Sequence, residues 1–76
     1  MPERLPRITA TELLAALERG GWERIRQRGS HIRLAHPGHP VKVTVSIHAH
    51  QIVKPGTLRS ILEQAGLTVE ELIELL

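Results

Sequence analysis

His31 is the residue of this sequence best suited to chemistry, because it stands among arginines. Four of them lie within seven residues of it, Arg24, Arg26, Arg28 and Arg33. Histidine has an unperturbed pKa of about 6.5 and acts as an acid or a base near neutral pH, and guanidinium groups bind phosphate oxygens through paired hydrogen bonds. Metal-free cleavage of RNA needs a base, an acid and cations around the developing charge. His31 is therefore a candidate acid/base for RNA cleavage; the alternative is an exposed strand residue without a function.

Three segments around His31 alternate between apolar and polar residues, which is typical of strands with one buried face. They cover residues 22–28, 30–35 and 41–48, and turns at Gly29 and at Pro37-Gly38 separate them. The apolar residues expected on the buried face are Ile25, Ile32, Leu34, Val43, Val45 and Ile47. The polar residues expected on the opposite, exposed face are Arg24, Arg26, Arg28, His31, Arg33, Lys42, Thr44, Ser46 and His48.

Helices are expected on both sides of these strands in the sequence. Residues 9–19 begin with the spacing of a capping box at Thr9 and carry a leucine stripe at helical spacing. A second helix is expected to start at Thr57 as its N-cap and to end at Gly66. The capping-box spacing recurs at Thr68 and predicts a short last helix.

The chain is short enough for one domain, residues 1–76. An antiparallel sheet of three strands in so small a protein has helices over one face only. We therefore expect an α+β fold in the order α-β-β-β-α with a short C-terminal helix, and both main helices on the apolar face.

Charge is distributed unevenly along the chain. Residues 22–56 hold six Lys or Arg and a single acid, Glu23, whereas residues 57–76 hold one arginine and four glutamates. No acid is expected on the exposed face of the sheet, so its like charges repel one another and a bound polyanion would offset them. The residues expected to bind RNA are Arg24, Arg26, Arg28, Ser30, Arg33, Lys42, His48 and Lys54. Lys54 is either a phosphate contact or a plain helix start.

The other histidines raise the question of a metal site. His36 and His39 flank the Pro-Gly turn, and His48 and His50 lie close together. The sequence has neither Cys nor Asp, so the usual ligand sets for structural zinc are incomplete. We expect no metal and no cofactor. With no signal peptide and no membrane-spanning run, we expect a soluble, cytoplasmic protein that does not bind membranes.

Several motifs together resemble the HicA (YcfA-like) toxins. They are Gly21-Trp22, Arg28-Gly29-Ser30-His31, His36-Pro37, the Val-Thr-Val-Ser-Ile-His of residues 43–48, and the Lys-Pro-Gly-Thr-Leu-Arg-Ser-Ile-Leu-Glu-Gln-Ala-Gly-Leu-Thr of residues 54–68. Their order and spacing fit this family from about residue 9 to the C-terminus. At Ser46 the chain departs from the family, which often has proline there.

The resemblance implies a double-stranded-RNA-binding-domain-like fold and a ribosome-independent mRNA endonuclease, an mRNA interferase. It also implies a cognate HicB antitoxin that masks the active site, and it places the catalytic histidine of the family at His31. We expect the free toxin to be monomeric. His48 is the second acid or base, a phosphate contact or an ordinary strand end. The alternative functions are a non-catalytic RNA-binding module and an interaction domain.

Overall fold

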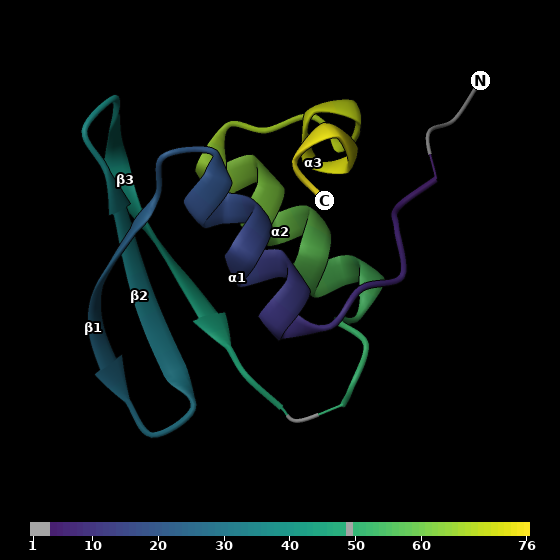
Figure 1. Ribbon diagram of the computed structural model, residues 1–76, viewed down its shortest axis with the longest axis horizontal. Helices are drawn as coiled ribbons and strands as arrows, with labels where there is room; N and C mark the ends of the chain where they lie inside the picture. Colours follow the sequence, from purple (N-terminus) through teal and green to yellow (C-terminus); the bar gives the residue numbers. More distant parts are fainter. Residues whose placement is uncertain (1–3, 49) are drawn as a thin grey trace.

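The computed structural model of the protein describes residues 4–48 and 50–76. Its helices and strands follow the order that the sequence predicts. They are α1 (Ala10–Arg19), β1 (Glu23–Arg28), β2 (His31–His36), β3 (His39–Ser46), α2 (Pro55–Ala65) and α3 (Val69–Leu75). The three strands form one antiparallel sheet in the order β1-β2-β3. All helices lie on one side of this sheet (Figure 1), so the predicted α+β class and topology are confirmed.

Helices α1 and α3 begin with the capping boxes that their sequences predict. Thr9 Oγ1 accepts a hydrogen bond from the backbone N–H of Glu12, and the Glu12 carboxylate accepts one from the backbone N–H of Thr9. Thr68 and Glu71 repeat this arrangement at the start of α3. Both ends therefore satisfy N–H groups that a helix cannot satisfy internally.

Helix α2 begins two residues before the expected N-cap, Thr57. Its first residue is Pro55, and Lys54 is the N-cap, without a side-chain capping bond. Proline suits this first position because its φ angle is already helical and its missing N–H would have had no partner there. The prediction of Thr57 as the N-cap was wrong. The predicted end at Gly66 is confirmed, since Gly66 adopts a left-handed conformation with φ 67°.

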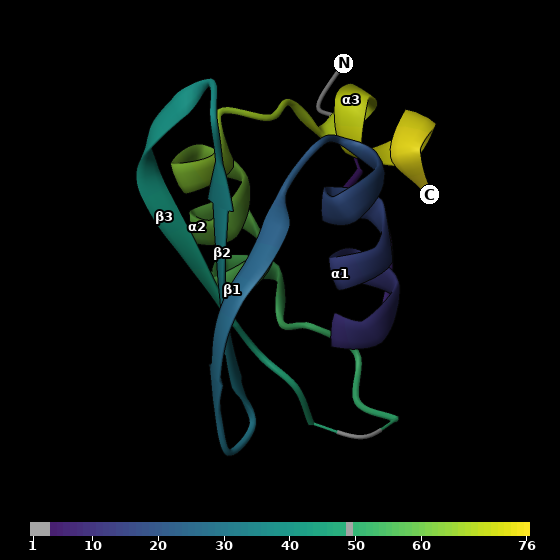
Figure 2. The same cartoon turned by 60° about the vertical axis from the view of Figure 1, so that its left-hand side comes forward.

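The hydrophobic core lies between the sheet and the helices. Figure 2 shows α1 and α2 as two separate helices that both lie on the same side of the strands. Leu13, Leu14 and Leu17 of α1 are fully buried, as the leucine stripe predicts. The residues that meet them from the sheet, α2, α3 and the segment before β1 are Ile32, Leu34, Val43, Val45, Leu58, Ile61, Leu62, Leu72 and Trp22. This aliphatic core holds the strands that carry His31 and its neighbours.

A β-bulge at Ile25 changes the faces of β1. Arg24 pairs with Leu34 and Arg26 pairs with Arg33, so Ile25 is the extra residue between them. Directly paired residues of an antiparallel sheet share a face. Arg24 therefore lies on the helix side with Leu34, and Ile25 is 49% exposed. The prediction that Ile25 is a core residue was wrong, because strict alternation does not survive the bulge.

The bulge also moves Glu23 to the exposed face, where it pairs with Ala35 at the opposite end of β1 from Arg28. The expectation of a face free of acids was wrong at this end. Strand β3 begins earlier and ends earlier than expected, so that His48 follows the strand instead of lying in it. Within the described residues, no helix is long and apolar enough to cross a membrane.

Candidate nucleic-acid interface on the sheet

His31 lies on the exposed face of the sheet, on the middle strand and at the end next to the β1–β2 turn. It is the first residue of β2 and pairs with Arg28 of β1 on one side and with Ser46 of β3 on the other. The next row across the same face consists of Arg26, Arg33 and Thr44. The imidazole is therefore surrounded by side chains from all three strands, and it is exposed to solvent.

These two rows form a shallow depression of about 270 Å³. The residues that line it are Arg26, Arg28, His31, Arg33 and Thr44. No carboxylate is among them, and within the described residues none of the three arginines makes an ion pair. Three guanidinium groups around one imidazole favour an anionic ligand, because each unpaired cation gains from a phosphate.

Arg24 lies apart from the other three arginines. Its Nη2 donates to Glu18 Oε1 of α1 at 3.0 Å, on the helix side of the sheet. The expected place of Arg24 on the exposed face was therefore wrong, and its charge is already compensated. Thr44 lines the depression although it is not among the predicted RNA-binding residues, and the alternation of residues 41–48 places it on the correct face.

Ser30 and Lys42 flank the depression without lining it. Ser30 belongs to the turn between β1 and β2, and its carbonyl accepts the backbone N–H of Ile47 at 2.7 Å. Lys42 is exposed and precedes the buried Val43, which places it on the same face as Thr44. Both therefore border the surface that carries His31.

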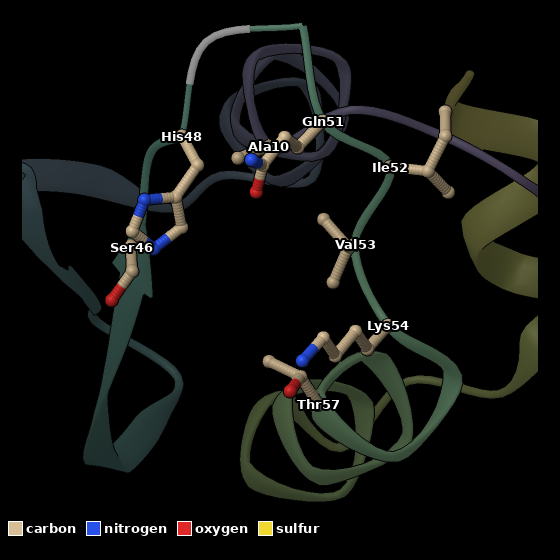
Figure 3. Close-up of a pocket in the computed structure, with 8 residues that line it drawn as sticks. All are labelled: Ala10, Ser46, His48, Gln51, Ile52, Val53, Lys54 and Thr57. Atoms are coloured by element: carbon tan, nitrogen blue, oxygen red, sulfur yellow. The ribbon is translucent and has the colours of Figure 1, made fainter.

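His48 and Lys54 both line a different site, a cavity of about 320 Å³ beyond the end of β3. Figure 3 shows His48 on one side of this cavity and Lys54 with Thr57 on the facing side. His31 is not among the lining residues, and His48 is not among those of the sheet depression. Of the predicted RNA-binding residues, Arg26, Arg28 and Arg33 thus line the depression and His48 and Lys54 line the cavity, whereas Arg24, Ser30 and Lys42 line neither.

His36 and His39 belong to an aromatic cluster with Trp22 at the other end of the sheet. The His39 ring stacks on Trp22 with centroids 5.3 Å apart, and the His36 ring meets His39 edge-on at 4.8 Å. His36 Nδ1 accepts the backbone N–H of Gly38 at 2.8 Å, so its Nε2 carries the proton that faces the Gly20 carbonyl at 3.1 Å. These histidines hold the hairpin against the end of α1. In the described part of the chain, no group of three or more side chains is arranged to hold a metal ion.

The fold and the site define a small α+β protein with a cationic sheet face centred on a histidine. The family model of the HicA toxin of bacterial toxin-antitoxin systems matches residues 10–67. Because this match covers well over half of the chain, the chain belongs to the HicA toxin family. The protein is thus a toxin whose family works with an antitoxin partner. No curated protein matches the sequence.

Proposed function

We propose that this toxin is a metal-independent endoribonuclease that cleaves mRNA on the exposed face of its sheet. The observation that carries the proposal is the depression in which one imidazole, His31, stands among Arg26, Arg28 and Arg33 without a carboxylate in its lining. A strand of RNA brings both a phosphate for the arginines and a 2′-hydroxyl for the histidine. The double-stranded-RNA-binding-like order of elements supports the same ligand class.

The reaction is an internal transfer at phosphorus. The 2′ oxygen attacks the adjacent phosphate, a new O2′–P bond forms and the P–O5′ bond breaks. The 2′-hydroxyl gives up its proton and the leaving 5′ oxygen gains one, so the products are a 2′,3′-cyclic phosphate and a 5′-hydroxyl. His31 performs one of these proton transfers, while the guanidinium groups bind the phosphate oxygens and stabilise the additional charge of the transition state.

Two further exposed polar residues extend this surface. Lys42 and the turn residue Ser30 lie beside the depression and are proposed to contact the RNA backbone on either side of it. Arg24 is excluded from this set because its guanidinium is bound to Glu18. The proposed protein partner is a HicB-type antitoxin that covers the same cationic face, and acidic residues on that partner would neutralise it.

A non-catalytic RNA-binding module is the alternative that the same surface supports. Such a module would use the arginines for phosphates in the same way, and His31 would contribute only a contact. The two functions differ in the effect of removing the imidazole. Removing a general acid or base costs about 10²–10⁴-fold in rate, whereas removing one neutral contact leaves most of the affinity in place.

The test is induced expression in a bacterial host of the wild type and of His31→Ala, with growth and the integrity of mRNA as readouts. His50→Asn is the matched control, since His50 is exposed, lines neither site and has a left-handed backbone that asparagine tolerates. Growth arrest with mRNA cleavage by the wild type and the control alone supports the proposal. Equal cleavage by His31→Ala contradicts the role of His31. RNA binding without cleavage by the purified wild type favours the binding module.

A further inference from the structure

The cavity beyond β3 is built where three elements come together. Ser46 ends β3, Ala10 begins α1, and Lys54 precedes α2. The segment between β3 and α2 forms its wall through Gln51, Ile52 and Val53. This wall is fixed to the N-terminal segment, because Ile52 forms a β-bridge with Thr9 and the N–H of Val53 donates to the carbonyl of Ile8 at 2.8 Å. Backbone contacts therefore tie this wall of the cavity to the segment that leads into α1.

Every polar side chain of this cavity can donate a hydrogen bond, and no carboxylate is among them. The side chains that bring polar atoms to it are Ser46, His48, Gln51, Lys54 and Thr57. Within the described residues, none of these side chains makes a hydrogen bond or an ion pair. The Lys54 ammonium lies toward the cavity beside Thr57, and the His48 ring faces it from across (Figure 3). A compact oxyanion would satisfy several of them at once.

The cavity and the sheet depression are adjacent through one cross-strand pair. His31, which lines the depression, pairs directly with Ser46, which lines the cavity. The Ile47 N–H donates to the Ser30 carbonyl, so the next pair, His31 and Ser46, is a non-hydrogen-bonded one. Side chains approach most closely at such pairs, with Cα atoms about 4.5 Å apart. A single strand of nucleic acid that passes His31 therefore reaches the cavity next.

We propose that this cavity is a second phosphate subsite, which binds a backbone phosphate of the RNA strand next to the one cleaved at His31. The inference rests on the proposed function and assigns the subsite to Lys54 as the cation, with the His48 imidazole and the Ser46 and Thr57 hydroxyls as hydrogen-bond donors. A backbone phosphate offers two charged oxygens and two ester oxygens as acceptors, which matches this number of donors. The same strand then contacts both sites, and the subsite positions the substrate without taking part in the bond changes.

The test uses single-stranded RNA bound to the His31→Ala protein, which keeps the RNA intact. Fluorescence anisotropy gives the Kd at several salt concentrations for this protein with and without Lys54→Gln. Each phosphate contact to a single strand contributes about 0.7 to the slope of log K against log salt. The slope is expected to become shallower by about 0.7 on Lys54→Gln. Arg59→Gln is the matched control, because Arg59 is exposed on α2, the helix that Lys54 precedes, lines a separate depression and carries the same charge.

A second measurement separates this inference from the proposed function. With His31 intact, Lys54→Gln is expected to raise KM for an oligonucleotide and to leave KM for a dinucleotide with one phosphodiester unchanged. An unchanged salt slope and an unchanged oligonucleotide KM overturn the subsite while cleavage stands. If the wild type binds RNA without cleaving it, the endonuclease proposal fails. The salt slope of RNA binding by Lys54→Gln still shows whether the cavity binds a phosphate. Oligoglutamate serves as the probe for an acidic protein. If Lys54→Gln lowers the affinity for oligoglutamate and leaves the affinity for RNA unchanged, the cavity is a contact for an acidic protein and the inference is overturned.

Discussion

Arg24 donates from Nη2 to the carboxylate of Glu18 at 3.0 Å and so connects the start of β1 to the end of α1. In the sequence Arg24 begins an alternating series with Arg26 and Arg28, but in the fold it lies on the opposite side of the sheet from both. The bulge at Ile25 is the physical cause. Of these three arginines, only two remain available to a ligand on the exposed face.

The first prediction compares Arg24→Gln with Arg26→Gln. Arg26→Gln should weaken RNA binding and make its salt slope shallower by about 0.7, because the lost cation lines the depression. Arg24→Gln should leave both unchanged and lower stability by at most about 1 kcal/mol, since the lost ion pair is half-exposed. Anisotropy titrations and urea unfolding measure these effects. A similar loss of RNA affinity in both variants would contradict the assignment of Arg24 to the helix side.

The second prediction concerns Gly21, which joins α1 to the segment before β1. Its φ angle is +95°, and an added Cβ would lie 2.8 Å from Nε2 of His36. Gly21→Ala should therefore destabilise the protein by about 1–3 kcal/mol and disturb the rings that stack on Trp22. Gly56→Ala is the control, because Gly56 lies in α2 and its Cβ would meet nothing within 4 Å. Urea unfolding followed by Trp22 fluorescence distinguishes the two, and an equal effect of both would be evidence against the strain at Gly21.

The third prediction concerns Ser46, the last residue of β3. The Ile47 N–H donates to Ser30, and bonds of an antiparallel ladder alternate, so the N–H of Ser46 points away from β2. Ser46→Pro should therefore keep every ladder bond and change Tm by only a few degrees. Ile47→Pro removes the bond to Ser30 and should cost about 1–3 kcal/mol. Thermal unfolding by circular dichroism measures both, and a large loss in Ser46→Pro would show that the register is different.

The fourth prediction is a pH dependence of stability. The pKa of Glu71 lies below its usual value. The main cause is the hydrogen bond that its carboxylate accepts from the backbone N–H of Thr68, and the second is a hydrogen bond with the Thr68 side chain. A carboxyl group with a lowered pKa in the folded state stabilises the fold fully above its unfolded pKa, near 4.5, and loses this contribution as the pH falls below it. Glu71→Gln should therefore reduce the fall in Tm between about pH 5 and 3.

The control for this measurement is Glu74→Gln, which removes a carboxylate of the same helix that makes no capping bond. Thermal unfolding of the wild type and both variants across the acid range gives the comparison. If Glu71→Gln and Glu74→Gln change the acid limb equally, the effect comes from net charge and not from the cap.

Local rules predict much of this fold. The capping boxes at Thr9 and Thr68 and the glycine at 66 indicate where helices begin or end, and the structure confirms each of them. The alternation of β2 and β3 correctly separates Ile32 and Val45 from the exposed side. These predictions succeed because caps and alternation depend on residues that are neighbours in the sequence.

The remaining features depend on contacts that spacing does not show. The bulge at Ile25 reverses the faces of the residues before it, and nothing in that stretch of alternating residues indicates it. His48 lies outside the sheet because β3 ends at Ser46. It lines the same cavity as Lys54 because the chain turns toward α2 after β3. His31 and the arginines that follow the bulge were placed correctly, since their register is continuous from Arg26 to Arg28.

The bulge in β1 has a further effect at the edge of the sheet. This strand has a neighbour on one side only, and an unpaired strand edge is a template for aggregation with another chain. An irregular ladder interrupts the regular row of donors and acceptors, and the repeated arginines repel a second copy of the same edge. The β1 edge of the sheet is thereby less suited to pairing with the same edge of a second copy.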